Sequence, residues 1–434
     1  MLRARLVRID NAEIATSGHT IAESPRVTAA IARAHACAGD SIDRIAGRPV
    51  VPLRLNSASH SPPAMPVERR ERARHFAIGD PQAPLERFFA ILDRWALLDD
   101  TGWLQPDVAL ISMGDYFDWG GRADRLRASA SGLALLAWLA AHPRDQVTIL
   151  LGNHELGRVG ELASFADENF AEAHALAVEA YRGGNIDVRR EAEVLDRFPA
   201  LPTIELAARD FSTFSVAQRE LVTALLRAGR LRAAAARGPV LFCHAGVTLD
   251  DIEALGLDIH RPLHAGEIAD ALNRALDERV AGWAGEALDI NNLHRPGDRE
   301  YGEGRGIFYH RPSNPAVEYD STLFHGTYRR RYDPRRLPLG VVQVIGHIND
   351  RKCRQLLGPW ADDETAIPGM LRHLTTDGAS VRYTSRLPEI WPPHIDSRSA
   401  LMIFTDGQMN RTAPDTYELL DISAWARGDD AHAR

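Results

Sequence analysis

Side chains that could bind divalent cations recur along the 434-residue chain, each shortly after a short apolar run. They are two carboxylates, two amides and two imidazoles: Asp80, Gln82, Asp115, Asn153, His244 and His347. Oxygen and nitrogen ligands mixed in this way suit borderline ions such as Mn, Fe, Zn or Co. The set is too large for one ion and fits two ions that share one bridging carboxylate.

Two ions held in this way could keep a hydroxide between them and clamp the oxygens of a phosphate group, so that attack is in line and developing charge is neutralised. His154 directly follows the candidate ligand Asn153 and need not be a ligand itself. It could protonate the leaving oxygen as a general acid, with Asp118 orienting it. These residue types and their spacing therefore indicate phosphoester hydrolysis.

The apolar runs predict the elements that position these side chains. Short β-branched runs bounded by turn residues are typical of buried strands, and such runs lie at 75–78, 108–111, 147–151, 240–243 and 341–345. Helical patterns over 85–95 and 126–139 separate the first three runs. This alternation predicts a layered α/β domain, in which loops at the carboxyl ends of the strands meet in one crevice.

Two long segments, 157–238 and 250–338, interrupt the alternation and are expected to be insertions that cap the crevice. Their helical patterns cover 165–181, 215–236 and 265–276. We expect a domain over 73–425 that contains both insertions.

Residues 1–72 form an extension of unknown role. They contain a helical pattern at 27–37 and a linker-like stretch at 56–63. The extension is expected to be either a tail packed on the main body or a partly ordered arm.

Composition excludes several classes of protein. Lys352 is the only lysine among 51 basic residues, which rules out a G-x-x-x-x-G-K-[ST] phosphate loop and the protein-kinase signature. The three cysteines are far apart, so neither a disulfide framework nor a cysteine zinc site is expected. No signal peptide is expected, and the longest apolar run, 132–141, is too short for a membrane span. With a net charge of −8, a cytoplasmic protein without a nucleic-acid partner is expected.

Five ordered blocks give the chain a resemblance to the calcineurin-like metallophosphoesterases. The block from Gly114 to Gly120, GDYFDWG, is similar to the GDxxDRG motif of that family, and the block at 152–155 matches its GNHE motif. The blocks at 79–82, 244–246 and 346–347 stand where the family has GDxHG, HGG or HAG, and GH. Within the superfamily, the chain looks most similar to the phosphoprotein phosphatases and the symmetrical diadenosine-tetraphosphate hydrolases.

The resemblance implies a four-layer α/β/β/α sandwich and two metal positions. Asp80, Gln82 and Asp115 would hold the first ion, and manganese is the ion expected in vitro. The second ion would be held by four residues: Asp115, Asn153, His244 and His347. His154 would be the general acid, paired with Asp118.

Three departures from the family pattern bear on the substrate. Gln82 replaces a histidine, which gives the first ion a weaker, neutral ligand. Trp119 replaces the arginine that grips phosphate in the phosphoprotein phosphatases, so another arginine must do so or the substrate differs; the candidates are Arg311, Arg305, Arg122 and Arg158. Asn349 stands where nuclease-type relatives have a second histidine.

A phosphomonoesterase is therefore the first expectation for this chain, with phosphorylated small molecules, nucleotides or phosphoproteins as substrates. The alternatives are a nucleoside polyphosphate hydrolase, a phosphodiesterase, and a catalytically silent metal-binding protein of the same fold. Gln82 and Trp119 weaken the phosphatase expectation, whereas the intact His154 and Asp118 support it.

Overall fold

The computed structural model describes residues 24–45, 73–182, 185–302, 304–317, 330–364, 367–386, 395 and 397–426. The expected linker at 56–63 lies outside the described residues, as do 1–23 and the rest of 46–72.

Two sheets form the centre of the molecule. The first has five strands in the order β17-β1-β2-β3-β6: β17 (Leu420–Asp421), β1 (Arg74–Ile78), β2 (Val108–Ser112), β3 (Val147–Leu150) and β6 (Leu231–Arg232). Strands β1, β2, β3 and β6 are parallel, and β17 closes the edge antiparallel to β1. The predicted strands at 75–78, 108–111 and 147–151 are thus confirmed.

The second sheet has six strands in the order β15-β14-β16-β13-β8-β7. They are β15 (Val381–Thr384), β14 (Arg372–Thr376), β16 (Ala400–Phe404), β13 (Val342–Ile345), β8 (Val240–Cys243) and β7 (Ala234–Arg237). The central strand β13 runs parallel to both β8 and β16. These strands confirm the predictions at 240–243 and 341–345.

The two sheets pack face to face. Alternate residues of β1 and β2, such as Ala77 and Ile111, share one buried cluster with Val240, Phe242 and Val344 of the second sheet. A period of two along a strand sends successive side chains to opposite faces. The other face of the first sheet, which includes Phe76 and Ile78, packs against helices.

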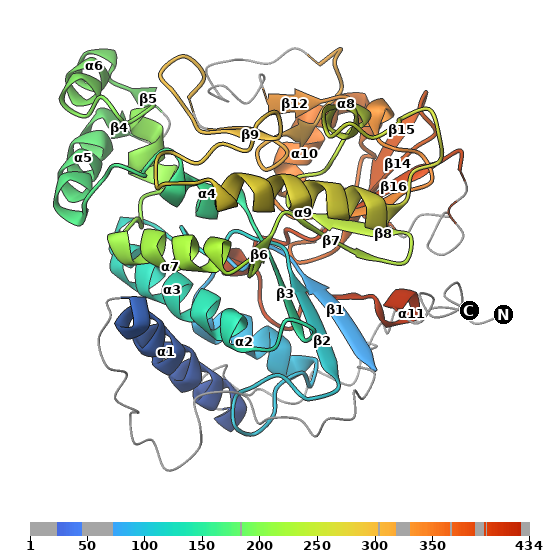
Figure 1. Cartoon of the computed structure of the whole chain (residues 1–434), viewed down its shortest axis with the longest axis horizontal. Coiled ribbons are helices and arrows are strands. Elements are labelled where there is room, and N and C mark those ends of the chain that lie inside the picture. The colour runs from blue at the N-terminus through green and yellow to red at the C-terminus, as the bar shows by residue number, and fades with distance from the viewer. Residues whose placement is uncertain are drawn as a thin grey trace.

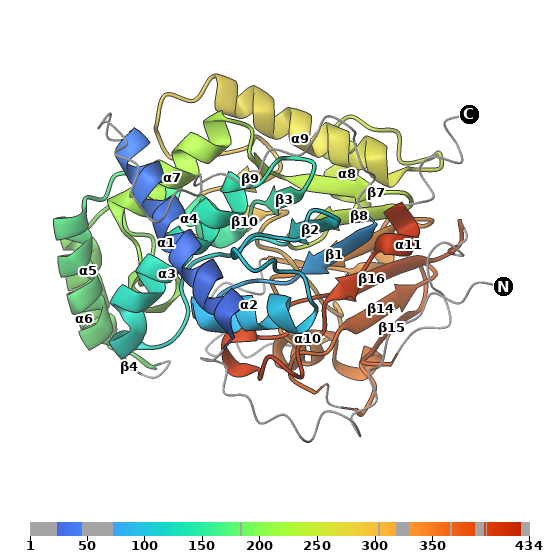
Figure 2. The ribbon, with the colours of Figure 1, turned by 90° about the horizontal axis from the view of Figure 1, so that it is seen from below.

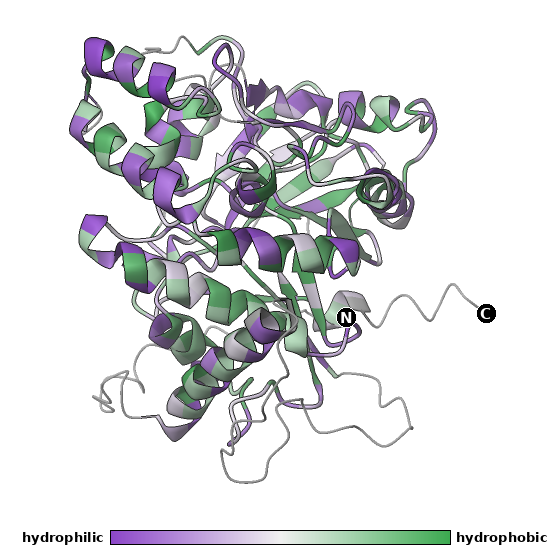
Figure 3. Cartoon of the chain, turned by 60° about the vertical axis from the view of Figure 1, so that its left-hand side comes forward, coloured by the Kyte–Doolittle hydropathy of each residue, from purple (hydrophilic) through white to green (hydrophobic). Residues whose placement is uncertain are grey.

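Helices cover the outer faces of both sheets (Figures 1 and 2). α1 (Pro25–Ile45), α2 (Leu85–Arg94), α3 (Arg125–Ala141) and α7 (Val216–Arg227) lie on the side of the first sheet, and α9 (Ala265–Ala281) packs on β7 and β8 of the second. The strands inside the sandwich are apolar, and the helices turn polar residues outward (Figure 3). This arrangement confirms the predicted α/β sandwich. Within the described ranges, no helix combines the length and apolar character needed to cross a bilayer.

Part of the first long segment forms a separate lobe at one end of the molecule (Figure 1). It contains α5 (Asp167–Ala180), α6 (Val188–Arg197), the short strands β4 (Tyr181–Arg182) and β5 (Asn185–Ile186), and a π-helical turn at Leu206–Asp210. Its own buried core includes Phe170, Phe198, Phe211 and Phe214. Residues 162–214 are called the lobe below.

The helix expected over 215–236 is wrong in its second half. α7 ends at Arg227, and Gly229 takes a left-handed conformation (φ 58°) that turns the chain. The alanine-rich residues that follow favour helix by propensity, but they form β7 and pair antiparallel with β8. Pairing with a buried strand overrides a weak local preference. Residues 216–238 therefore belong to the sandwich and not to a cap.

The remaining described elements follow α7. They include α8 (Leu249–Ala254), β9 (His294–Arg295), β10 (Arg305–Gly306), β11 (Arg311–Pro312), β12 (Arg331–Tyr332), α10 (Asp350–Leu357) and α11 (Ser423–Ala426).

Helix α1, within the N-terminal extension, packs on the main body. Ala30 and Ala34 are fully buried in the same cluster as α2 and α3. Gly102 permits this approach: it has φ +83°, and a Cβ there would lie 2.4 Å from the backbone nitrogen of Ala30. Arg33 adds a cation–π contact, 5.2 Å from the centre of the Trp103 ring.

We predict that Gly102→Ala weakens the docking of α1. A side chain at positive φ costs roughly 1–2 kcal/mol by itself, and the clash with α1 should add about 1–3 kcal/mol. Gly256→Ala is the matched control, because Gly256 has φ +78° but nothing within 4 Å of its Cβ position. Urea unfolding and limited proteolysis near α1 measure both effects; equal losses in the two variants would contradict this role of Gly102.

Candidate metal centre and active site

The candidate ligands lie where the strands end. Asp80 follows β1, Asp115 follows β2, and Asn153 begins α4 (Asn153–Val159) after β3. His244 and His347 follow β8 and β13 in the second sheet. Because these strands are parallel within each sheet, their carboxyl ends bring the loops together at one edge of the sandwich.

Four side chains meet at one point. Ligand atoms of Asp115, His244 and His347 all lie within 4.8 Å of one another. The amide oxygen of Asn153 lies 3.1 Å from Nε2 of His244 and 2.9 Å from Nδ1 of His347. Nε2 of His244 is in turn 3.4 Å from a carboxylate oxygen of Asp115. These are the four residues that the sequence predicts for one ion.

Hydrogen bonds to backbone carbonyls orient both imidazoles. Nδ1 of His244 lies 2.8 Å from the carbonyl oxygen of Met113, and Nε2 of His347 lies 3.0 Å from that of Tyr309. When each of these nitrogens donates, the other nitrogen of the ring is left as an acceptor that faces the cluster. Metal-binding histidines are held in the same way, with the second nitrogen donating to a carbonyl or carboxylate.

Asp80 supports the presence of a cation beside this cluster. The residue is 4% exposed, and its Oδ2 accepts a 2.7 Å bond from the backbone N–H of His347. Among the described residues, Oδ1 has no hydrogen-bond partner. A buried, unpaired carboxylate oxygen is costly unless it is paired or coordinates a metal. The donor set therefore fits divalent cations.

A third carboxylate, that of Asp406, interacts electrostatically with Asp80. Burial, followed by the negative charge of Asp406, raises the pKa of Asp80 well above its usual range. Asp406 follows β16, and its backbone carbonyl accepts a 2.7 Å bond from the buried Arg372. From the sequence alone, Asp406 and Gly407 follow a predicted strand at 401–404 and form either a turn near the site or only a turn.

Gln82 is held beside the Asp115 loop. Its side-chain amide donates a 2.9 Å bond to the carbonyl oxygen of Phe117. Gln82 therefore joins the loop that follows β1, to which it belongs, to the loop that follows β2.

Glu155 locks the loops after β2 and β3 together. Its carboxylate, fully buried, accepts backbone hydrogen bonds from Asp115 and Gly152 at 2.9 Å and from Tyr116 at 2.8 Å. The bond to Gly152 also caps the start of α4. The last residue of the GNHE block is thus a structural bridge between two ligand-bearing loops.

Tight backbone geometry explains the glycines that precede the ligands. A Cβ at Gly152 would lie 2.2 Å from a carboxylate oxygen of Asp115, and one at Gly346 would lie 1.8 Å from Oδ1 of Asp80. Asp115 and His347 themselves adopt left-handed conformations, with φ 59° and 66°. Such strain in non-glycine residues is concentrated at functional sites.

His154 and Asp118 form a hydrogen-bonded pair beside the cluster. Nδ1 of His154 lies 2.7 Å from Oδ2 of Asp118, and its Nε2 lies 3.8 Å from a carboxylate oxygen of Asp115. Burial alone would lower the pKa of His154, but the charges of Asp115 and Asp118 outweigh it and raise the pKa to about 9. In the metal-free protein the imidazole is therefore protonated at neutral pH.

The candidate phosphate-binding arginines lie in different surroundings. Arg158 is fully buried and paired with Asp118 at 2.6 Å, so it is not available to a substrate, and that candidate is wrong. Arg305 pairs with Asp298 at 3.4 Å and lies over the Tyr301 ring. Arg122 lies in the short helix at Arg122–Asp124.

Arg311 is electrostatically linked to the cluster of candidate metal ligands. It is 7% exposed and donates a 3.0 Å bond to the carbonyl oxygen of Tyr309, the same atom that accepts from His347. Burial, with added repulsion from Arg311, lowers the pKa of His347 well below its usual range. His347 is thereby kept neutral, as a metal ligand must be.

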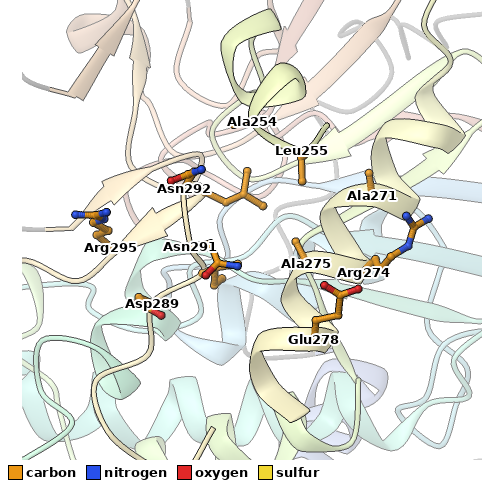
Figure 4. A pocket seen from close by; sticks show the side chains of 12 residues that line it. Ala254, Leu255, Ala271, Arg274, Ala275, Glu278, Asp289, Asn291, Asn292 and Arg295 are labelled. Atoms are coloured by element: carbon orange, nitrogen blue, oxygen red, sulfur yellow. The ribbon is translucent and has the colours of Figure 1, made fainter. Parts of the chain in front are cut away.

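A separate cavity of about 620 Å³ lies between α8, α9 and the 289–295 segment. Arg274 and Glu278 project toward it from α9, and Asp289, Asn291, Asn292 and Arg295 line the opposite side (Figure 4). It shares no lining residue with the metal cluster.

Comparison with solved structures finds cold-active protein tyrosine phosphatases. One is 14% identical over 64% of this chain and 64% of its own, with a TM-score of 0.32. A point mutant is 12% identical over 80% and 75% of the two chains, with a TM-score of 0.36. The phosphatase of a psychrophilic Shewanella species is 11% identical over 80% and 75%, with a TM-score of 0.33. The chain thus spans 64% of the first of these proteins and 75% of the other two.

Comparison with curated proteins finds no match. The calcineurin-like phosphoesterase profile matches residues 74–298, just over half of the chain. The matched part includes the loops that carry Asp80, Asp115, Asn153 and His244, and His347 lies beyond it. The chain therefore belongs to the calcineurin-like phosphoesterase family of metal-dependent hydrolases.

Proposed function

We propose that the chain is a metal-dependent phosphomonoesterase in which His154 is the general acid. The observation that carries this proposal is the orientation of His154: one ring nitrogen is bonded to Asp118, and the other lies on the side of the metal cluster, 3.8 Å from Asp115. A protonated imidazole in this place suits transfer of a proton to a leaving oxygen.

Two divalent cations fit the donor set. Asp80, Gln82 and Asp115 would hold the first, and manganese is the ion to test. The second would be held by Asp115, Asn153, His244 and His347. When bound, the cations supply positive charge for the phosphoryl oxygens and lower the pKa of water.

The residues of the chain itself provide the proton and orient the substrate. His154 gives its Nε2 proton to the leaving oxygen, and the Asp118 carboxylate stabilises and orients the imidazolium. Arg311 is the proposed arginine for the phosphate, because its charge acts next to His347. Trp119, in the position of the family arginine, is buried at 6% exposure and carries no charge.

Asn349 supports a phosphatase over a nuclease. Its side chain accepts a 3.0 Å bond from the backbone N–H of Lys352 and caps α10. The residue at the position where nuclease-type relatives have a histidine is thus the N-cap of a helix. Phosphorylated small molecules, nucleotides and phosphoproteins are the proposed substrate classes.

The direct test is hydrolysis of p-nitrophenyl phosphate and bis-p-nitrophenyl phosphate with and without Mn. We expect turnover of the monoester to depend on Mn and to be abolished by a chelator. Asp115→Asn and His154→Ala should each lower this turnover by at least about a hundredfold. Preference for the diester would instead indicate a phosphodiesterase. Turnover of neither compound, with metal bound, would contradict the proposal and favour a nucleotide-specific enzyme or a silent binding protein.

Metal binding itself tests the ligand assignment. We expect His244→Ala to weaken Mn binding by at least about tenfold, because the ring nitrogen that faces the cluster is lost. His260→Ala is the matched control, since His260 is exposed on the loop after α8. Calorimetric titration measures the affinity of both variants for Mn. Equal affinity in the two variants would show that His244 is not a metal ligand.

The pH dependence tests the acid. His154 must be protonated to act as an acid, so kcat should fall on the alkaline side as this group loses its proton. The carboxylate of Asp118 raises the pKa of His154. Asp118→Asn removes a charge that raises this pKa, so the fall should begin at lower pH. Asp258→Asn, in an exposed loop, should leave the profile unchanged. An alkaline limb that stays in place in Asp118→Asn would exclude His154 as its origin.

A further inference from the structure

The Asp118 carboxylate is held at both of its oxygens. Oδ1 accepts a 2.9 Å bond from the backbone N–H of Thr213 and a 2.7 Å bond from its hydroxyl. Oδ2 lies 2.7 Å from Nδ1 of His154 and 2.6 Å from Nη1 of Arg158. A carboxylate bonded at one oxygen alone can rotate about its last bond, whereas one bonded at both oxygens is fixed.

Arg158 is built into this arrangement through each of its nitrogens. Nη1 also donates to the carbonyl oxygen of His154 at 3.0 Å, and Nη2 donates to the hydroxyl of Thr213 at 3.2 Å. Nε donates to the side chain of Gln218 at 3.1 Å. A fully buried guanidinium needs such complete pairing, because an unpaired buried charge is strongly destabilising.

Aromatic rings enclose the same group. The guanidinium carbon of Arg158 lies 4.6 Å from the centre of the Phe117 ring and 5.6 Å from that of Phe211. The Phe211 ring also meets the His154 ring edge to face at 5.5 Å. Gly157 makes this possible, since a Cβ there would lie 2.4 Å from an atom of the Phe211 ring.

These contacts connect the lobe to the proposed general acid. Phe211 belongs to the buried core of the lobe, and Thr213 lies two residues further along the chain. The carbonyl oxygen of Ser212, between them, accepts a 2.6 Å bond from Arg125 at the start of α3. The bond to Arg125 thus holds the end of the lobe in the place where Thr213 donates two hydrogen bonds to Asp118.

We infer that Arg158 and Thr213 are positioning residues for the general acid: they fix the Asp118 carboxylate, which in turn aims the His154 imidazole at the leaving oxygen. The inference rests on the proposed role of His154. Proton transfer needs a near-linear donor and acceptor, and catalytic groups must be held within roughly 10–20° of the productive geometry. The lobe then contributes to the chemical step through Thr213.

The alternative is a purely structural role, in which Thr213 and Arg158 only neutralise a buried carboxylate. The two roles differ in what a variant changes. Loss of positioning should matter most when the leaving oxygen is strongly basic and needs its proton, whereas a stability defect lowers all activities alike.

Thr213→Val and Thr213→Ser, assayed on phenyl phosphate and p-nitrophenyl phosphate, provide the test. Valine keeps the shape but removes the hydroxyl that serves Asp118 and Arg158; serine restores it. We expect Thr213→Val to lower kcat for phenyl phosphate by about tenfold, with a smaller loss on p-nitrophenyl phosphate and little change in KM. Thr213→Ser should retain most of the wild-type ratio between the two substrates.

The matched control is Thr376→Val, which removes a buried hydroxyl bonded at 2.8 Å to the carbonyl oxygen of Ser380, in the β14–β15 hairpin. We expect it to lower the midpoint of thermal unfolding and to leave the ratio between the substrates unchanged. An equal loss on both substrates in Thr213→Val, or failure of Thr213→Ser to restore the ratio, would overturn the inference.

A double-mutant cycle separates positioning from the assignment of the acid. In a His154→Ala background, Thr213→Val should cause no further loss on phenyl phosphate, because the group that it positions is absent. A further loss of the same size would show that Thr213 acts independently of His154. If His154→Ala alone lowers kcat equally on both substrates, His154 is not the general acid. The proposed mechanism and the inference would then both be wrong, before Thr213 is tested.

Discussion

Negative charge buried between two sheets is the constraint on which the site depends. Asp80 and Asp115 are 4% and 3% exposed, and Asp406 acts on Asp80 from a third loop. Carboxylates this close cannot all remain charged in a low-dielectric interior without positive charge beside them. In the metal-free protein these carboxylates raise the pKa of His244 to about 9 despite its burial, so its imidazolium supplies some of that charge. A bound cation would replace that proton and leave the imidazole neutral. In the part of the chain that the structure describes, no group donates a hydrogen bond to Oδ1 of Asp80, which fits the positive charge of a bound cation.

The fold meets this constraint through the ends of parallel strands. Each candidate ligand lies in a loop shortly after a buried strand, so the hydrogen-bonded ladder of that strand sets where the loop begins. Glycines before the ligands allow the loops to approach one another, and Glu155 joins two of these loops by accepting three backbone bonds. The result is a rigid donor set in which both ligand histidines are bonded to backbone carbonyls on their outer side.

Asp118 is a further buried carboxylate that needs positive charge, and it lies beside the candidate ligands. Burial alone would raise the pKa of the Asp118 carboxyl. The positive charges of Arg158 and His154 beside it outweigh burial and lower this pKa far below its usual range. The pairing of Asp118 is completed by a segment more than fifty residues further along the chain, which ends the lobe. The lobe has its own apolar core, yet Thr213 near its end is bonded to Asp118, the partner of the proposed general acid.

The sequence by itself determined the strands and a layered α/β domain, because short apolar runs bounded by turn residues are typical of buried strands. The sandwich and the set of candidate ligands followed from the resemblance of five ordered blocks to one family, and the match over residues 74–298 confirms that family. Tertiary structure decided two features that depend on contacts and not on spacing. Residues 234–237 pair with β8 and do not continue a helix, and the charge of Asp406 raises the pKa of Asp80. It also decided that Arg158 serves Asp118 and is buried away from substrate. These outcomes depend on contacts between segments far apart in sequence, where burial and pairing outweigh local preference.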